Sequence, residues 1–371
     1  MHPLLAAADG AAAVAARHAD EGEQLRRLPS DVVDALCDAG VLRMCVPAAY
    51  GGPEVDPPTM LEVIERVSRA DGAAGWCTMI ASTTSLLSHY VEPEHARMIW
   101  GDPTTVTGGV FARLGSAARV DGGYRVSGRW MWGSGTHHCQ WITGGATGDG
   151  FSGSMWFRAD QVEFHDTWHT SGLRGTGSGD FEVCEVFVPD GLATQPQVTG
   201  PMVDSLLGWF PDMTLLAVGV AAAGLGIGRH ALDAIVELGT AKKPQFSSRT
   251  ISQSGVAQAE LAKAEAGLRA ARAFLYDEVS LAWETLRSGG RIDVAARARM
   301  RLAGAHAAEA AVRAADAAYT LGGGTALFEH SPLQRCLRDA HVVTQHIMVS
   351  PRLYETLGKV HFGIDIDASM I

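Results

Sequence analysis

Residues 130–136, Trp-Met-Trp-Gly-Ser-Gly-Thr, place aromatic rings, hydroxyl groups and glycines side by side. The indole of Trp132 can form an apolar wall, while the Ser134 hydroxyl and the amides of Gly133 and Gly135 can donate hydrogen bonds. An apolar wall with a few placed polar groups is typical of a small-molecule site. A structural interpretation also stays open, in which both tryptophans share one face of a strand and pack on the core.

Two other segments carry groups that could take part in chemistry. His346 can act as an acid or a base near neutral pH, although a lone histidine can also be a satisfied core residue. The hydroxyls of Thr176 and Ser178 flank Gly177, and a simple turn would have the same sequence. The glycines of residues 224–228 lie inside a helical pattern with no preceding strand, so we expect close helix packing there and not a dinucleotide loop.

The composition excludes several other kinds of function. The chain has 371 residues, 47% of them hydrophobic, and a formal net charge of −11. We therefore expect a sizeable core and no binding to nucleic acid or anionic membranes. The six cysteines are scattered and form no C-x-x-C pair, which predicts buried thiols in a reducing cytoplasm and no metal site.

Neither a secretion signal nor a membrane span is expected. The first 24 residues contain Asp and Glu at helical spacing and lack a basic segment before an apolar stretch. The most apolar segment, Leu215 to Leu225, is too short to cross a bilayer.

The hydrophobic pattern changes twice along the chain. Apolar residues at helical spacing extend to about Trp100, and alternating runs with glycine-rich turns follow, including a hairpin turn at residues 121–123. Long helical patterns then return, the last of them at residues 331–358. We predict an α+β fold with an N-terminal helical domain (1–103), a central β-barrel or β-sandwich domain (104–210) and a C-terminal four-helix bundle (211–371).

This order of elements resembles the acyl-CoA dehydrogenase superfamily, and motifs along nearly the whole chain support the resemblance. They are Val46-Pro47-x-x-Tyr50-Gly51-Gly52, Trp168-x-x-x-Gly172-Leu173-Arg174-Gly175-Thr176-Gly177-Ser178, Phe187-Val188-Pro189, Gly322-Gly323-Gly324 and Arg338-Asp339-Ala340. The resemblance implies a flavin bound without covalent attachment in the crevice between the β domain and the bundle. It leaves FMN and FAD open.

The resemblance also implies which residues contact the flavin. The expected cofactor-binding residues include Trp132, Gly133, Gly135, Thr176, Gly177, Ser178 and Gly323. Two more, Arg249 and Gln258, resemble positions from which a neighbouring subunit reaches the phosphate end. The resemblance also implies a homotetramer.

The residues after Arg338-Asp339-Ala340 indicate the type of flavin chemistry. Many dehydrogenases of the family place a catalytic glutamate where this chain has Ile347, which cannot accept a proton. Gln345-His346 instead resembles the two-component flavin monooxygenases of the superfamily. That resemblance implies reduced FMN or FAD from a separate flavin reductase, O2 as co-substrate, and oxygenation of a small aromatic or polyketide-like substrate through a C4a-(hydro)peroxyflavin.

His346 is the leading catalytic candidate, because a histidine can supply and remove the protons that this chemistry requires. Ser134 is the second, since a serine at this strand end hydrogen-bonds the flavin or its peroxide in the hydroxylases that the chain resembles. A further histidine of those hydroxylases falls on Thr84, which cannot act as a base. Candidates to replace it in space are His89, His137 and His138.

The expected substrate pocket includes Trp76, Thr84, Trp209 and Phe210. The segment 199–214 is rich in proline and aromatic residues, and we expect it to cover the pocket mouth. Two other functions stay open: an acyl-CoA dehydrogenase with a relocated base, and a non-catalytic flavin-fold partner subunit. The chain shows no nicotinamide-binding β-α-β unit, so reduced flavin has to come from another protein.

Overall fold

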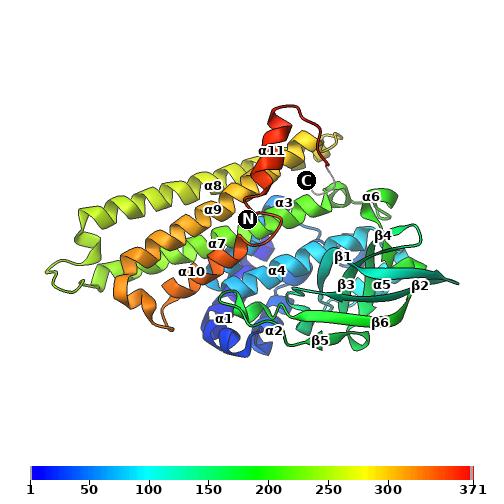
Figure 1. Cartoon of the computed structure of the whole chain (residues 1–371), viewed down its shortest axis with the longest axis horizontal. Coiled ribbons are helices and arrows are strands. Elements are labelled where there is room, and N and C mark those ends of the chain that lie inside the picture. The colour runs from blue at the N-terminus through cyan, green and yellow to red at the C-terminus, as the bar shows by residue number, and fades with distance from the viewer. Residues whose placement is uncertain (1, 368–370) are drawn as a thin grey trace.

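The computed structural model describes residues 2–367 and residue 371, and its elements follow the expected order of helices, strands and helices (Figure 1). The helices before the sheet are α1 (Pro3–Leu25), α2 (Ser30–Asp38), α3 (Pro57–Ala70), α4 (Gly72–Ser85) and α5 (Pro93–Trp100). Helix α4 begins after Asp71, whose carboxylate accepts a hydrogen bond from the amide of Ala74 at 2.8 Å. Such a cap satisfies an amide that the first helical turn leaves without a partner.

The β region forms one mixed sheet. Within the described residues its strands are β1 (Thr107–Val120), β2 (Gly123–Trp130), β3 (Trp141–Gly148), β4 (Phe151–Arg158), β5 (Glu163–His165), β6 (Asp180–Pro189) and β7 (Ala193–Thr194), in the order β5-β6-β2-β1-β3-β4-β7. The predicted hairpin joins β1 to β2, with Val120 opposite Gly123 and Gly122 at φ 72°. Strands β1 and β3 are parallel, and the other described pairs are antiparallel.

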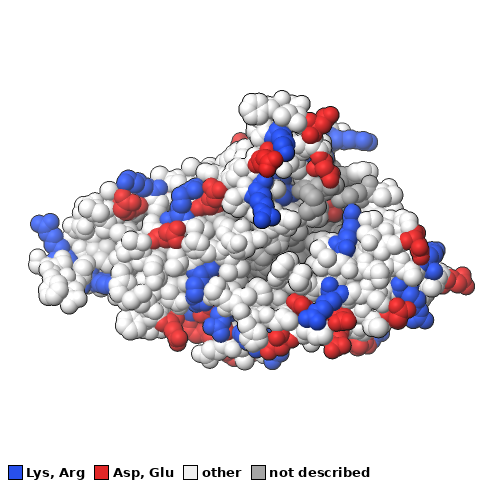
Figure 2. Space-filling model, in the orientation of Figure 1, with Lys and Arg blue, Asp and Glu red and all other residues white. Residues whose placement is uncertain are grey.

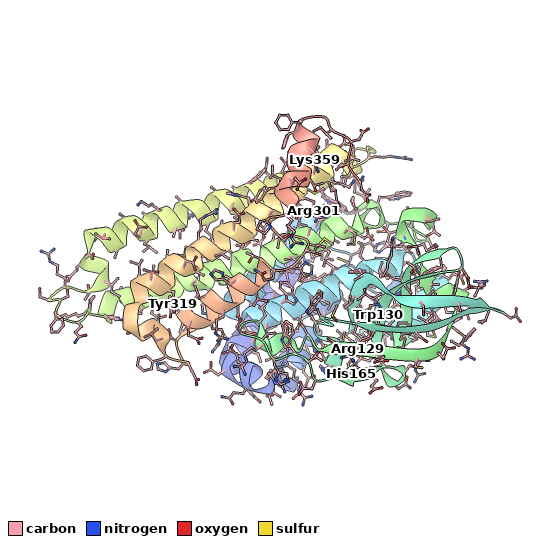
Figure 3. The ribbon with its side chains drawn as sticks, viewed as in Figure 1. Arg129, Trp130, His165, Arg301, Tyr319 and Lys359 are labelled. Carbon is pink, nitrogen blue, oxygen red and sulfur yellow. The ribbon has the colours of Figure 1, made fainter. Side chains whose placement is uncertain are left out.

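Trp130 is the centre of the sheet's core. A Cβ placed on Gly115, Gly128 or Gly144 would lie only 2.5, 2.9 or 2.6 Å from its ring atoms, so three strands have room for this indole because they carry glycine. The indole donates a hydrogen bond to the carbonyl of Gly145 at 2.8 Å and is fully buried. Trp130, which Figure 3 marks inside the sheet region, therefore packs on the core, as the structural interpretation predicts.

The helices after the sheet are α6 (Pro196–Thr199), α7 (Asp212–Ala241), α8 (Gly255–Arg287), α9 (Val294–Gly322), α10 (Pro332–Val343) and α11 (Leu353–His361). The predicted single helix over 331–358 is wrong, because the chain leaves the helix at Thr344 and resumes it at Leu353. Pro351 contributes to this break, since proline has no amide to donate and disfavours helical backbone at the residue before it. The turn between α10 and α11 carries His346.

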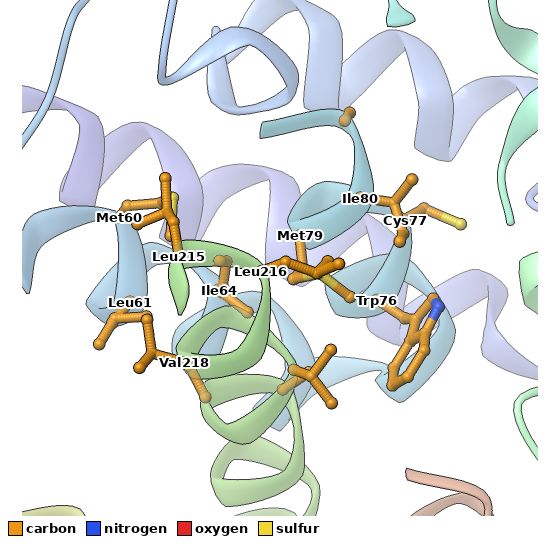
Figure 4. Packing of buried hydrophobic residues seen from close by; sticks show 14 of the residues in the cluster. Met60, Leu61, Ile64, Trp76, Cys77, Met79, Ile80, Leu215, Leu216 and Val218 are labelled. Carbon is orange, nitrogen blue, oxygen red and sulfur yellow. The ribbon is translucent and has the colours of Figure 1, made fainter. Parts of the chain in front are cut away.

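Helix α7 is the central helix and packs against α3, α4, α9 and α10 (Figure 1). The close packing predicted for its glycines is confirmed: a Cβ on Gly226 would lie 2.4 Å from the carbonyl oxygen of Glu65. Figure 4 shows the apolar side chains of α3, α4 and α7 in contact, with Trp76 at the edge and its indole nitrogen directed away from the cluster. The core therefore holds Trp76 while its polar atom faces elsewhere.

Two smaller expectations are corrected. Helix α7 is long and apolar enough to span a membrane, but 89% of its most apolar window is buried inside the fold. The central position of α7 among the other helices therefore explains why its residues are so apolar. Cys184 is exposed, although the other cysteines are buried or partly buried. On the face in Figure 2, positive and negative side chains are interspersed.

Candidate active site

Four separate segments meet around the indole of Trp76, which lies on α4. Its Nε1 donates a hydrogen bond to Ser134 Oγ at 3.0 Å, in the loop after β2. Its ring centroid lies 5.6 Å from that of His346 in an edge-on contact, in the turn after α10. Ser134 Oγ lies 2.6 Å from Ser178 Oγ, in the segment before β6. The two predicted catalytic residues, 212 positions apart in the sequence, therefore contact the same side chain.

The hydroxyls in the loop after β2 and before β6 form a continuous row, which we call the hydroxyl row: Ser134, Ser178 and Thr176. Ser178 Oγ lies 2.6 Å from Thr176 Oγ1, and Thr176 Oγ1 donates to the carbonyl of Leu173 at 2.8 Å. All three side chains are buried. The interpretation of Thr176-Gly177-Ser178 as a turn with self-satisfied hydroxyls is thus only partly right, because Ser178 bonds to Ser134.

His346 is partly buried, and its Nε2–H can donate a hydrogen bond. Its Nδ1 accepts the backbone amide of Met348 at 3.3 Å, so the neutral ring carries its hydrogen on Nε2. Burial, assisted by the positive charge of Arg301, lowers the pKa of the His346 imidazole to about 4. At neutral pH the ring is neutral, and none of the described residues hydrogen-bonds to its Nε2–H. Figure 3 marks Arg301 on α9, on the helical side of the molecule.

The loop that carries Trp132 differs from the expectation in one respect. Trp132 lies beyond the end of β2 with φ 66° and is 66% exposed, so it does not pack on the core as Trp130 does. The amides of Gly133 and Gly135 donate to the carbonyls of Gly179 and Thr176, both at 2.9 Å. The expectation that these amides are free to reach a flavin is wrong, because they attach the loop to the segment before β6.

The expected substrate residues do not all line one surface. Thr84 is fully buried, and its hydroxyl donates to backbone carbonyls that include Thr107 at 3.0 Å. Phe210 is also fully buried. Both are therefore structural in this fold, which corrects their place in the pocket. Trp209 is 60% exposed, and Trp76 contacts both catalytic candidates.

Segment 199–214 is fastened to the short turn after α4. His89 Nε2 lies 2.9 Å from Ser205 Oγ, and its Nδ1 lies 2.9 Å from the carbonyl of Leu86. The Tyr90 hydroxyl donates to the carbonyl of Gly208. Both ring nitrogens of His89 are thus engaged, so this histidine holds the segment and does not replace the histidine expected at Thr84. Burial lowers the pKa of His89 to about 4.

Arg249, Gln258 and Gly323 lie at the end of the bundle remote from the sheet, near the connections of α7 to α8 and of α9 to α10 (Figure 1). Gln258 is exposed and its Nε2 donates to the carbonyl of Ser252 at 2.8 Å. Gly323 ends α9 with φ 52°. These residues do not join the hydroxyl row within one chain, and their contact with a flavin stays a prediction about an assembly.

Sequence reasoning quoted Asp339 only as part of a motif and missed its role in the site. Its carboxylate accepts the amide of Leu173 at 2.6 Å, and Leu173 has φ 47°, a left-handed conformation that side chains seldom adopt. The carbonyl of Leu173 also ends the hydroxyl row. Burial, assisted by the nearby carboxyl of Asp71, raises the pKa of Asp339 to about 7. Asp339 on α10 therefore positions the loop that carries Thr176 and Ser178.

Comparison with known proteins shows which family the chain belongs to. Residues 5–96 match the acyl-CoA dehydrogenase N-terminal domain, and residues 218–351 match the acyl-CoA dehydrogenase C-terminal domain. The chain is 34% identical to indole-3-acetate monooxygenase of Pseudomonas putida over 349 residues, covering 92% of this chain and 89% of that protein. This chain belongs to the flavin-dependent monooxygenases of the acyl-CoA dehydrogenase family.

Two other similarities describe the monooxygenase further. It is 30% identical to the flavin-dependent monooxygenase oxygenase subunit HsaA of Mycobacterium tuberculosis, over 99% of this chain and 97% of that one. Its fold matches XiaF from Streptomyces sp. in complex with FADH2 and glycerol, with a TM-score of 0.91 and 26% identity, over 98% of this chain and 95% of that one. The predicted family and fold are confirmed.

The residues of the monooxygenase fit a flavin. The exposed indole of Trp132 offers an apolar wall, and the Ser134 hydroxyl and the His346 Nε2–H provide polar groups on two residues that both contact Trp76. A flavin ring requires both kinds of contact. Ile347, at the position of the dehydrogenase glutamate, is an exposed aliphatic residue.

Proposed function

We propose that this monooxygenase is the oxygenase component of a two-component system. It takes reduced FMN or FAD from a separate reductase and uses O2 to hydroxylate or otherwise oxygenate a small aromatic substrate. The observation that carries the proposal is the meeting of His346 and Ser134 at Trp76. The name of one relative, an oxygenase subunit, supports a separate reductase, and the name of another, indole-3-acetate monooxygenase, supports an aromatic substrate.

The bound reduced flavin supplies the electrons that activate O2. His346 is the proposed catalytic residue, because its neutral ring offers Nε2–H as a donor and can regain the proton afterwards. Ser134 is the second proposed catalytic residue, and it acts through a hydrogen bond to the flavin. Trp132, Thr176, Gly177 and Ser178 are proposed to line the ring site, with Trp76 and Trp209 toward the substrate.

The proposed assembly is a homotetramer in the cytoplasm. Arg249, Gln258 and Gly323 lie away from the hydroxyl row of their own chain, which supports a role toward a flavin held by a neighbour. Phe246, between α7 and α8, is fully exposed, and a partner would remove this apolar side chain from water. Light scattering measures the assembly directly, and a monomeric mass would contradict it.

The proposed chemistry is tested by mixing protein loaded anaerobically with reduced FMN or FAD with oxygenated buffer in a stopped-flow cell. We expect a transient absorbance that precedes the spectrum of oxidised flavin. His346→Ala and Ser134→Ala should shorten its lifetime. The matched control is His341→Ala, because His341 is exposed and pairs with Asp316 at 3.0 Å. Immediate reoxidation in the unmodified protein would contradict an oxygenase and favour a dehydrogenase.

A further inference from the structure

The direction of every hydrogen bond in the hydroxyl row follows from its two ends. The indole N–H of Trp76 can only donate, and the carbonyl of Leu173 can only accept. Because Thr176 donates its hydroxyl hydrogen to the Leu173 carbonyl, it must accept from Ser178. Because Ser178 donates to Thr176, it must accept from Ser134. The four donors Trp76, Ser134, Ser178 and Thr176 thus make one hydrogen bond each along the row.

The reverse direction satisfies fewer groups. If Thr176 donated to Ser178, its lone pairs would face the carbonyl oxygen of Leu173 at 2.8 Å. The hydrogen of Ser134 would then have no partner within the row. Leaving a buried hydroxyl without a partner is unfavourable, so the forward direction is favoured. Ser134 therefore has no hydrogen to offer a ligand, and one lone pair of its oxygen is unused.

An acceptor at this position distinguishes the two redox states of a flavin. The ring nitrogen N5 carries a hydrogen in the reduced flavin and only a lone pair in the oxidised flavin. Ser134 Oγ can accept from the first, while two lone pairs would repel each other in the second. The expectation that Ser134 donates is thereby reversed.

We propose that Thr176 and Ser178 are positioning residues that hold Ser134 as a hydrogen-bond acceptor and so make the site prefer reduced over oxidised flavin. The inference rests on the proposed function, since it assumes that a flavin reaches Ser134. It assigns to Thr176, which is separated from Ser134 by another hydroxyl, control over which way the serine hydrogen points. Asp339 supports the row from the other end by holding Leu173.

The deciding variant is Thr176→Val, because it keeps Ser134 and Ser178 and removes the acceptor of the Ser178 hydrogen together with the bond to the Leu173 carbonyl. Ser178 can then donate to Ser134, which frees the Ser134 hydrogen for the lone pair of oxidised flavin. The matched control is Thr136→Val. Thr136 is equally buried at 1% exposure, and its hydroxyl also donates three residues back, to Gly133 at 2.7 Å, but it is outside the row.

The measurements are the dissociation constants of oxidised and reduced FMN and FAD under anaerobic conditions, and the midpoint potential of the bound flavin. We expect Thr176→Val to lower the preference for reduced flavin about tenfold, which corresponds to a potential about 30 mV lower for two electrons. Thr136→Val should match the unmodified protein. Ser178→Ala should shift the potential in the same direction as Thr176→Val, and it provides a second variant if Thr176→Val does not fold.

The outcomes separate this inference from the proposed function. If the folded Thr176→Val and Ser178→Ala variants keep the preference of the unmodified protein, the inference is overturned while flavin binding stands. An equal shift in Thr136→Val would also overturn it, because a general loosening of the loop would then be the cause. If the unmodified protein binds neither flavin in either redox state, the proposed function fails and the inference fails with it.

Discussion

Helix α4 and the loops around Ser134 carry the same kinds of hydroxyl side chain but use them differently. The hydroxyls of α4 donate to carbonyls four residues earlier in the same helix, at 2.7–2.9 Å, in Thr78, Ser82, Thr83 and Thr84. The hydroxyls of Ser134, Ser178 and Thr176 bond to one another across two separate loops. A helix supplies its hydroxyls with local acceptors, whereas a loop hydroxyl depends on tertiary structure for its partner.

This difference decides which hydroxyls can respond to a ligand. The α4 hydroxyls donate to backbone carbonyls, most of them in the same helix, and Thr84 also reaches the carbonyl of Thr107 in β1. In the hydroxyl row, each hydrogen depends on the next oxygen, so a change at one end can reach the other. Polar residues in the expected pocket therefore divide into those that stabilise the fold and those that can act in the site.

The largest effect is expected from His346→Ala, which removes the imidazole that contacts Trp76. Loss of a general acid or base lowers turnover by about 10²–10⁴-fold, and flavin affinity should change little because His346 is not the only flavin contact proposed. Steady-state turnover of an aromatic substrate with excess reductase measures this effect. Thr84→Val, in the helix, is the comparison and should retain turnover. An equal loss in both variants would contradict the distinction between the two regions.

Much of the fold was predictable because local patterns determine it. The glycine-rich turn at residues 121–123 and the close packing of Gly226 both follow from sequence and are found in the structure. The end of the helix at Thr344 was missed, because the apolar spacing continues past it and only Pro351 signals a break.

The sequence predicts which residues belong to the site, but it does not predict the hydrogen bonds between them. Ser134 and His346 were found through resemblance to a family, and their meeting at Trp76 depends on three-dimensional packing. Trp130 and Trp132 could not be separated by sequence, since the strand end between them is set by tertiary contacts. The direction of a hydrogen bond depends on which oxygen lies next in space, which no spacing rule contains.

The second effect concerns Asp339, which anchors the loop from α10. Asp339→Ala leaves the buried amide of Leu173 without an acceptor and should lower the free energy of unfolding by about 1–3 kcal/mol. Denaturant unfolding measures this loss, and the redox preference should fall with it as the row loses its fixed end. Asp316→Ala serves as a control, because Asp316 is about half exposed and pairs with a half-exposed His341. Unchanged stability in Asp339→Ala would contradict the anchoring role.

Asp339→Asn tests a dependence of stability on pH. The pKa of Asp339 is raised to about 7 by burial, so between about pH 4 and pH 7 the folded protein holds a proton that the unfolded chain has lost. The contribution of this carboxyl to stability therefore falls as pH rises through that window. The amide side chain introduced by the substitution stays neutral and still offers an oxygen to Leu173, so the variant should gain stability relative to the unmodified protein from pH 4 to pH 8. A constant difference over this range would show that Asp339 stays ionised.

The smallest effect is expected from Thr84→Val, which tests the helix side of the comparison. The variant loses the hydrogen bonds of one hydroxyl to the carbonyls of Ile80 in α4 and Thr107 in β1, so we expect a loss of only about 1 kcal/mol in the free energy of unfolding. The preference for reduced flavin should equal that of the unmodified protein, unlike in Thr176→Val. Both are the same chemical change at buried threonines, so a difference between them can only reflect what each hydroxyl touches. If Thr84→Val lowered the preference as much as Thr176→Val, the α4 hydroxyls would belong to the site, and the division between structural and responsive hydroxyls would be wrong.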